Sequence, residues 1–184
     1  RRGAGRAVSA AQLRDLYDGF TSYIGERDMY YVNANIIKPL TKPRLLSFAE
    51  LAGPRPTRFF VSHFWGMPFQ QFVASIMKHK DSVVRAEAPH YWICLLSLNQ
   101  WRITEELGAG HWSRSSFYLA LTSGLCAATV MVMDEEAMPL RRAWCLFEVF
   151  QTCILSQQGT GFRGLLLCTP SGVLNGSGAT SVDL

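Results

Sequence analysis

The chain has 184 residues, of which 48% are hydrophobic and 12% aromatic, and this predicts a globular protein with one main domain. Its formal charge of +4 is concentrated near the start. Residues 1–58 contain ten Lys and Arg against five Asp and Glu, whereas residues 59–184 contain eight against nine. Because a nucleic-acid ligand needs a basic patch on the folded part, this distribution argues against nucleic-acid binding.

The cysteines and the longest uncharged stretch indicate the compartment. Five cysteines without a C-x-x-C pair lie mostly in apolar runs, which is typical of buried free thiols in a reducing compartment, so we expect a cytoplasmic protein. Residues 117–133 carry no charge, but the stretch is too short for a membrane span and is interrupted by Thr, Ser and Gly. We therefore expect no membrane partner. The chain shows no signal peptide and begins with Arg, so we interpret it as a piece of a longer protein.

Residues 1–56 are predicted to be a helical leader that packs on the domain or links it to something upstream. Residues 1–6, RRGAGR, are basic and Gly-rich, which predicts a disordered arm. Ser9 is expected to cap a helix that ends near Gly25, and Ser47 to open a short helix before Gly53. The segment between these helices, residues 30–43, is interrupted by prolines and is predicted to be loosely extended.

From residue 57 the pattern alternates between strands and helices. Apolar runs predict strands over residues 58–65, 91–98, 128–133 and 164–170, and helices are predicted to precede the last three strands. This order predicts an α/β domain over residues 57–170. We expect a three-layer, flavodoxin-like and mostly parallel sheet of about four strands in the order 2-1-3-4, with helices on both faces. Residues 171–184 are predicted to be a flexible Gly/Ser-rich tail.

A lone carboxylate, Glu148, lies inside the apolar helical segment 140–150, LRRAWCLFEVF. By the helical period it shares one face with Arg141 and with Trp144, which we expect to pack in the core. The other face is apolar and consists of Leu146, Val149, Phe150 and Cys153. Burying a bare carboxylate is costly, so two interpretations stay open. Glu148 is either a rim carboxylate paired with an arginine or a group that binds a ligand or performs catalysis.

Four segments in this order resemble the Toll/interleukin-1 receptor (TIR) domain superfamily, most closely its plant-like and protist-like branch. FVSHFWG resembles the first strand of that family, and YWICLLSLNQW resembles the second strand with the long loop after it. SSFYLALTSGLCAATVMVMD resembles the next helix and strand. RRAWCLFEV resembles the tryptophan-cysteine-x-x-glutamate helix, and together the matching segments span roughly residues 58–169.

The resemblance implies a signalling domain that cleaves the nicotinamide–ribose bond of NAD, with Glu148 as the catalytic carboxylate and no required cofactor. Nicotinamide leaves from a cationic nitrogen and needs no proton donor, so a single carboxylate that stabilises the ribosyl centre can suffice. Ligands of open parallel sheets bind beyond the carboxyl ends of the strands, where the strand order reverses. The order 2-1-3-4 places this point between the first and third strands, where residues 62–66 and 134–140 emerge.

The expected ligand contacts lie around Glu148. Phe64 and Trp65 can stack on a base or on nicotinamide, or they can simply pack against the sheet. Arg141 or Arg142 can meet a phosphate near the positive end of the helix. The full set expected to bind the nucleotide is Ser62, His63, Phe64, Trp65, Arg141 and Trp144.

Two other chemistries receive less support from the sequence. The four histidines form no H-x-x-x-H pattern, so we expect no metal site. A cysteine hydrolase that uses Cys145 and His63 is conceivable, but a buried structural thiol is the better interpretation of Cys145.

The alternative to an enzyme is a scaffold without catalytic activity that self-associates through the loop Asn99 to Trp112, with Trp101 or Trp112 as an anchor. An open crevice at Glu148, lined by Phe64, Trp65 and a basic residue, favours the enzyme. A Glu148 capped by a neighbouring side chain, together with exposed loop tryptophans, favours the scaffold.

Overall fold

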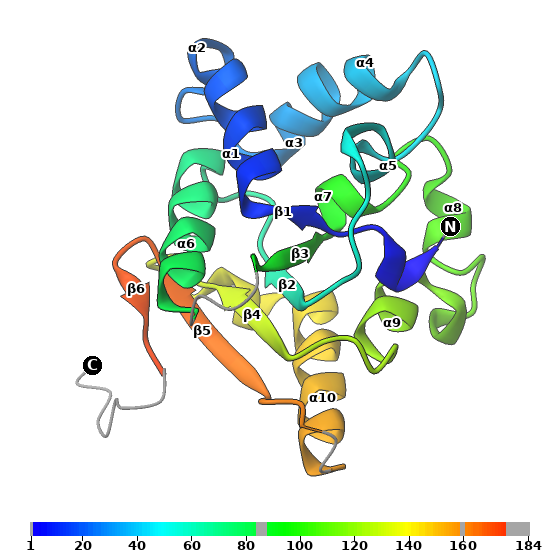
Figure 1. Cartoon of the computed structure of the whole chain (residues 1–184), viewed down its shortest axis with the longest axis vertical. Coiled ribbons are helices and arrows are strands. Elements are labelled where there is room, and N and C mark those ends of the chain that lie inside the picture. The colour runs from blue at the N-terminus through cyan, green and yellow to red at the C-terminus, as the bar shows by residue number, and fades with distance from the viewer. Residues whose placement is uncertain (1, 84–87, 159–160, 176–184) are drawn as a thin grey trace.

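The computed structural model describes residues 2–83, 88–158 and 161–175, and its centre is a mixed sheet (Figure 1). The sheet has six strands in the order β1-β3-β2-β4-β5-β6. The four inner strands pair in parallel, and the short strands β1 and β6 pair antiparallel to them at the two edges. The strands are β1 (Val8–Ser9), β2 (Phe59–His63), β3 (His90–Ile93), β4 (Ala128–Val132), β5 (Leu165–Thr169) and β6 (Gly172–Val173).

The predicted α/β class with a mostly parallel sheet is confirmed, whereas the predicted strand count and overall order differ from the structure. The inner strands β3-β2-β4-β5 have the relative order expected for four strands, but β1 and β6 extend the sheet to six. Each added strand has only two residues. A two-residue strand has no period that a sequence pattern can reveal, because its pairing depends on the long strand beside it.

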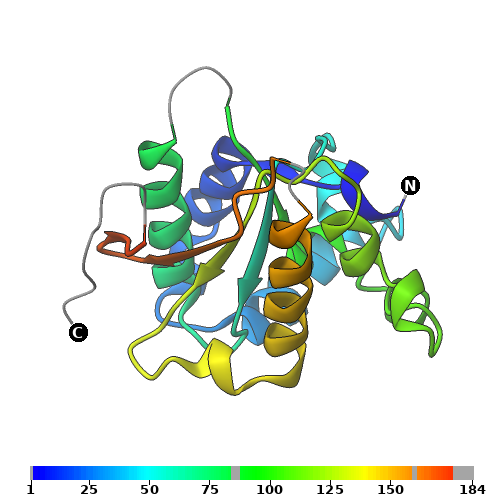
Figure 2. The same cartoon turned by 90° about the horizontal axis from the view of Figure 1, so that it is seen from below.

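Helices cover both faces of the sheet (Figure 2). On one side α6 (Phe69–Ser82) packs on the sheet and α1 (Ala10–Gly19) packs on α6, while α10 (Ala143–Gln157) covers the other side. Strand β2 is buried along its whole length: Phe59 and Val61 join one apolar cluster and Phe60 joins another. Successive strand residues point to opposite faces, so this alternation places β2 at the centre of the fold. Further helices are α2 (Thr21–Ile24), α5 (Phe48–Ala52), α7 (Cys94–Ser97), α8 (Ile103–Glu106), η3 (Trp112–Arg114), α9 (Ser116–Leu121) and η4 (Met138–Arg141).

The predicted helix starts in the leader are confirmed, and the predicted extended segment between them is wrong. Ser9 and Ser47 each form a capping box at the start of α1 and α5. Residues 29–41 are helical, in three consecutive elements: α3 (Met29–Val32), the π-helix η2 (Asn33–Ile37) and α4 (Lys38–Thr41). Asp28 caps the stretch by accepting from the backbone N–H of Tyr31 at 2.9 Å. Pro39 is tolerated because it lies in the first turn of α4.

The predicted disordered arm is also wrong for the residues that the structure describes. Residues 3–5 form the 3₁₀ turn η1, and the Arg6 side chain is buried between Glu50 and Glu106. A buried arginine is stable only with such partners, and partners that are distant in the sequence give no local signal. Leu13 of the leader belongs to the same apolar cluster as Phe59. The leader is therefore part of one core.

The end of the chain is described only in part. Of the predicted flexible tail, residues 171–175 contain β6, and residues 176–184 lie outside the described residues.

None of the helices within residues 2–83, 88–158 and 161–175 combines the length and the apolar character that a membrane span requires.

The predicted strand 91–98 ends earlier than expected. Strand β3 stops at Ile93, and the next four residues form the helical turn α7. The Ser97 hydroxyl accepts a hydrogen bond of 3.0 Å from the N–H of Ile93, and the N–H of Leu98 donates to the carbonyl of Cys94 at 3.1 Å. A short buried apolar run does not distinguish a strand from a helix, so the pattern could not place this change.

Candidate functional site

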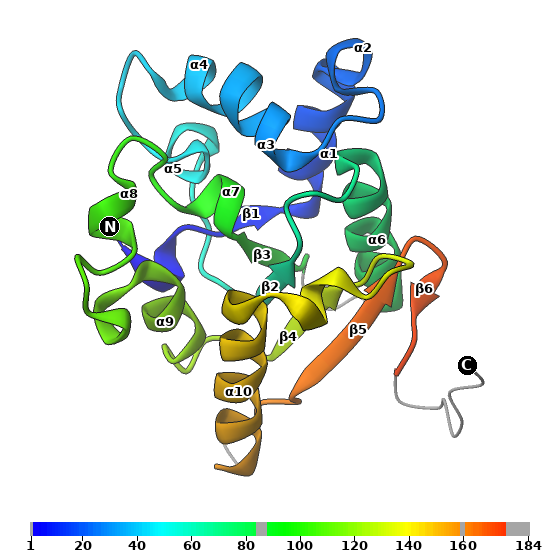
Figure 3. The ribbon, with the colours of Figure 1, turned by 180° about the vertical axis from the view of Figure 1, so that it is seen from behind.

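A cavity of about 520 Å³ lies at the carboxyl ends of β2 and β3. Its floor contains Val61 and His63 of β2, and Cys94 follows from the start of α7. One wall comes from the start of α10, which lies beside β2 (Figure 3). A concave apolar site of this volume at strand ends is where α/β sheets bind small ligands.

Glu148 is the only carboxylate among the described residues that line this cavity. The Ser62 hydroxyl, which is buried, donates a hydrogen bond of 2.5 Å to Glu148 Oε2. Burial raises the pKa of Glu148 to about 7, although the hydrogen bond from Ser62 acts in the opposite direction. Within the described ranges Glu148 forms no ion pair, so the interpretation as a rim carboxylate paired with an arginine is wrong.

Aromatic side chains and two cations complete the surroundings of Glu148. Phe64, Trp65 and Trp144 line the cavity together with Lys38 and Arg142. The Arg142 guanidinium carbon lies 5.4 Å from the centroid of the Phe64 ring. The cavity is therefore lined by ring faces suited to stacking, by two cationic side chains and by one carboxylate.

Trp65, which follows Phe64 in the loop after β2, is held by contacts on two sides. Its indole N–H donates to Cys94 Sγ at 3.0 Å. Its ring lies 5.3 Å from the ring of Tyr30, centroid to centroid. Gly66 allows Phe64 to fold back over the chain, because a Cβ at this position would lie 2.3 Å from the Phe64 ring.

The structure brings most of the predicted binding residues together. His63, Phe64, Trp65 and Trp144 line the cavity, and Ser62 reaches it through its hydrogen bond to Glu148. Arg142 lines the cavity, whereas Arg141 is exposed at the end of η4 and is not among the lining residues of the described chain.

Two further expectations are wrong. Trp144 was expected in the core but is 53% exposed, because it stands edge-on to Phe117 at the rim. The turn 134–140, expected at the site, contributes no lining residue within the described chain, since the cavity opens beyond β2 and β3 and not between β2 and β4. Helix α10 turns Glu148 inward and leaves Leu146 and Phe150 exposed at 48% and 60%. The apolar face of this helix is therefore its outer face.

The leader supplies a wall that the sequence did not reveal. Tyr30, Asn33 and Lys38 line the cavity from α3, η2 and α4, and Gln100 lines it from the loop after α7. The spacing 30, 33, 38 is compatible with one face of a helix, and this was the available signal. It was hidden because the prolines suggested an extended chain.

His63 and Cys145 do not form a nucleophilic pair, and the thiol that contacts the His63 imidazole is that of Cys94, with Sγ 3.7 Å from Nε2. Burial lowers the pKa of His63 to about 4 and raises the pKa of Cys145 to about 11. Cys145 Sγ contacts the backbone carbonyl of His63 at 3.5 Å and not its imidazole. A protonated thiol without a base is a poor nucleophile, so the cysteine hydrolase receives no support. In the part of the chain that the structure describes, no group of three or more His, Cys, Asp or Glu could hold a metal ion.

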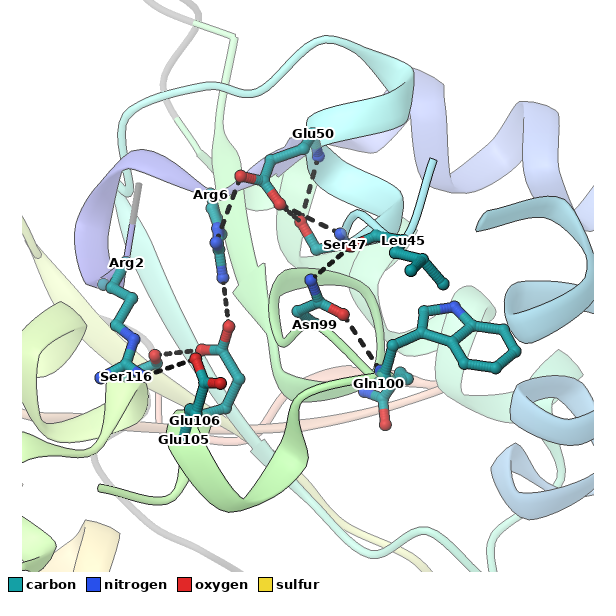
Figure 4. A network of polar contacts seen from close by, with 12 residues as sticks. Arg2, Arg6, Leu45, Ser47, Glu50, Asn99, Gln100, Glu105, Glu106 and Ser116 are labelled. Atoms are coloured by element: carbon teal, nitrogen blue, oxygen red, sulfur yellow. Dashed lines mark hydrogen bonds and ion pairs between the residues drawn. The ribbon is translucent and has the colours of Figure 1, made fainter. Parts of the chain in front are cut away.

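A buried ionic network holds the wall formed by α8 and α9 (Figure 4). Arg6 donates to Glu106 of α8 at 2.5 Å, and Glu106 also accepts a hydrogen bond from the hydroxyl of Ser116 at the start of α9. A second ion pair of 3.1 Å joins Arg6 to Glu50, which caps α5 through Ser47. The N-terminal residues thus fix the position of two helices whose apolar residues line the cavity.

The loop Asn99 to Trp112, predicted to mediate self-association, is exposed along most of its length. Asn99 and Glu106 are buried, whereas Trp101 and Trp112 are 36% and 50% exposed. Trp112 packs edge-on against Phe147 of α10, with ring centroids 5.3 Å apart. Most of this loop is therefore open to solvent, and its role in self-association stays a prediction.

Comparisons of the chain with protein families, with curated proteins and with solved structures found no match. The resemblance to the TIR superfamily therefore stays a prediction. What bears on function is the cavity, which is lined by a carboxylate of raised pKa, by aromatic rings and by two cationic side chains.

Proposed function

We propose that this domain is a TIR-like signalling enzyme that binds NAD, or a closely related nucleotide, and hydrolyses the nicotinamide–ribose bond with Glu148. The observation that carries the proposal is the position of Glu148, which lines the aromatic cavity with one carboxylate oxygen held by Ser62. The other oxygen, Oε1, has no hydrogen-bond partner among the described residues. That oxygen is available to a bound ligand.

The reaction needs little from the protein beyond a placed negative charge. When the bond from C1′ of the ribose to the nicotinamide nitrogen breaks, its electron pair moves to the nitrogen and neutralises it. The positive charge then develops on the ribosyl centre, which the Glu148 carboxylate stabilises. Water adds to C1′ and loses a proton, which a carboxylate with a pKa of about 7 can accept. The products are nicotinamide, ADP-ribose and one proton.

The remaining lining groups match the other parts of a dinucleotide. Phe64, Trp65 and Trp144 offer ring faces on which nicotinamide or adenine can stack. Lys38 and Arg142 provide positive charge for the pyrophosphate. The apolar walls keep water away from the ribosyl cation except where it attacks.

The test is the release of nicotinamide from NAD by the purified chain, measured over a range of protein concentrations and with a crowding agent. Glu148→Gln removes the charge but keeps the shape, and we expect it to lower the rate by about a hundredfold or more. Glu136→Gln is the matched control, because Glu136 is exposed and outside the cavity. The proposal is wrong if no condition gives release, or if Glu148→Gln matches the parent chain.

A self-associating scaffold is the second candidate, and the exposed face of α10 favours it. Leu146 and Phe150 lie on this face, and the single charged residue of the helix, Glu148, lines the cavity. Two copies could thus pair along α10 without repulsion between like charges. Sedimentation of the parent chain and of Phe150→Asp tests this candidate, with the exposed Tyr23→Asp as control. A monomer at all concentrations would rule it out.

A further inference from the structure

The side-chain amides of Gln100 and Asn33 form a chain of hydrogen bonds at the cavity wall. Gln100 Nε2 donates to the carbonyls of Cys94 and Leu95 at 3.2 and 3.1 Å. These two carbonyls can only accept, so they fix which end of the Gln100 amide is the nitrogen. Gln100 Oε1 then accepts from Asn33 Nδ2 at 3.5 Å.

This series of hydrogen bonds ends at an acceptor that has no donor. Asn33 Oδ1 is buried and has no hydrogen-bond partner in the described part of the protein. Because the nitrogen of Asn33 faces Gln100, the free atom is an oxygen, and it can be satisfied only by a donor. A buried polar atom left unpaired is unfavourable, so such an atom calls for an explanation. Asn33 and Gln100 are lining residues of the same cavity as Glu148.

The segment that carries Asn33 is fixed against the rest of the site. The N–H of Met29 donates to the carbonyl of Trp65 at 3.0 Å, just before Asn33 in the chain. After it, Thr41 Oγ1 accepts from the indole N–H of Trp101 at 3.0 Å. Asn33 itself begins the π-helix η2, a rare form that is frequent at functional sites. The acceptor is therefore presented by a wall anchored on both sides.

We propose that Asn33 Oδ1 determines the specificity of the site by accepting a hydrogen bond from an exocyclic N–H donor on a ring of the bound nucleotide. The inference rests on the proposed function and names the ligand group that Asn33 recognises. Nicotinamide carries such a donor in its carboxamide, and adenine carries one in its amino group. The chemistry is the same for both rings, and the following experiment distinguishes them.

The experiment measures dissociation constants of three dinucleotides with the full chain carrying Glu148→Gln, so that none is consumed. The probes are NAD, its analogue with nicotinate in place of nicotinamide, and its analogue with hypoxanthine in place of adenine. Each analogue replaces one exocyclic nitrogen by oxygen. We expect one analogue to bind about tenfold or more weakly than NAD, because a site built for a donor rejects a ligand that lacks it.

Substitutions at Asn33 then test whether this residue causes the difference. Asn33→Leu should remove the preference, because NAD loses the hydrogen bond and the weaker analogue has none to lose. Asn33→Asp retains an acceptor and should retain the preference. Asn35→Leu is the matched control, since Asn35 lies in the same π-helix but is exposed and outside the cavity.

The possible failures are distinguishable. If all three dinucleotides bind equally, or if Asn33→Leu keeps the full preference, the inference about Asn33 is overturned and the proposed function stands. If NAD does not bind and the chain with Glu148 intact releases no nicotinamide, the proposed function is overturned and the inference falls with it.

Discussion

The Ser62 hydroxyl donates a hydrogen bond of 2.5 Å to Glu148 Oε2, and this bond joins the end of β2 to the first half of α10. It fixes the carboxylate in an apolar setting and leaves its second oxygen free. A hydrogen bond to the charged form favours ionisation, whereas burial opposes it. The charge of Glu148 at neutral pH depends on the balance of these two effects.

Removing the Ser62 hydroxyl should shift the pH dependence of activity. If ionised Glu148 is required, kcat/KM of the parent chain rises with pH and levels off above about 7, the pKa that burial gives this carboxyl. Ser62→Ala removes the interaction that lowers the pKa, so the midpoint should move to higher pH. Ser62→Thr keeps a hydroxyl and should restore the parent midpoint. An unchanged midpoint in Ser62→Ala would mean that the hydrogen bond only holds the structure.

Neutralising Glu148 should stabilise the fold, and more so at high pH. The folded pKa of about 7 lies above the ordinary value of 4.5, so the folded state keeps a proton that the unfolded state releases between these values. The Glu148 contribution therefore lowers the free energy of unfolding as pH rises from about 4.5 to about 7. At pH 8 the cost is on the order of 3 kcal/mol.

Urea unfolding of Glu148→Gln and the parent chain at pH 5 and pH 8 measures this effect. In the difference between the two chains, the contributions of the other titrating groups to the free energy of unfolding cancel. One of these groups is His63, whose lowered pKa changes stability with pH in the opposite direction. A gain in stability at pH 8 that exceeds the gain at pH 5 is expected. Equal gains at both pH values would contradict the raised pKa.

How much the sequence could predict depends on whether the signal was local. The strand-and-helix alternation located the four parallel strands, and the lone Glu148 in an apolar helix drew attention to a residue that lines the cavity. Local caps such as Ser9 and Ser47 were also identified, because a capping box involves residues three apart.

The expectations that failed depended on partners far away in the chain. Arg6 and Glu106 are 100 positions apart, so residues 1–6 looked like a solvated arm. The helical period placed Trp144 and Glu148 on one face but could not tell which face turns inward. The cavity wall from the leader was missed for a similar reason, since Pro39 masked a helical stretch whose role depends on packing against Trp65.

The buried network at Arg6 should contribute strongly to stability. Arg6→Met leaves Glu106 buried without its cationic partner, and we expect a loss of about 3–5 kcal/mol in the free energy of unfolding. The double variant Arg6→Met with Glu106→Gln should recover part of this loss, because no unpaired charge remains at α8. Chemical denaturation of both variants gives the values. If Arg6→Met alone costs less than about 1 kcal/mol, the arm is not fixed as the structure indicates.

Gly66 should matter for ligand binding more than for stability. A Cβ at this position would lie 2.3 Å from the Phe64 ring, so Gly66→Ala must displace that ring. The displaced ring should also lose its contact with Arg142 at the cavity wall. We expect weaker nucleotide binding with a small change in melting temperature. Gly19→Ala is a suitable control, because nothing lies within 4 Å of a Cβ added there.

The two tryptophans Trp92 and Trp144 should respond in opposite ways to replacement by alanine. Trp92 is fully buried and stacks on Phe60 with ring centroids 5.0 Å apart, so Trp92→Ala should cost about 3–5 kcal/mol of stability. Trp144 is 53% exposed and its described ring contact is with Phe117, so Trp144→Ala should cost about 1 kcal/mol.

Binding should show the reverse order for the two variants. Trp144 lines the cavity, so Trp144→Ala removes a ring face on which the ligand can stack, and the dissociation constant for NAD should rise about tenfold. Titration of NAD into the Glu148→Gln chain with and without Trp144→Ala measures this change. If Trp144→Ala destabilises the fold as much as Trp92→Ala while leaving the dissociation constant for NAD unchanged, Trp144 belongs to the core and does not contact the ligand.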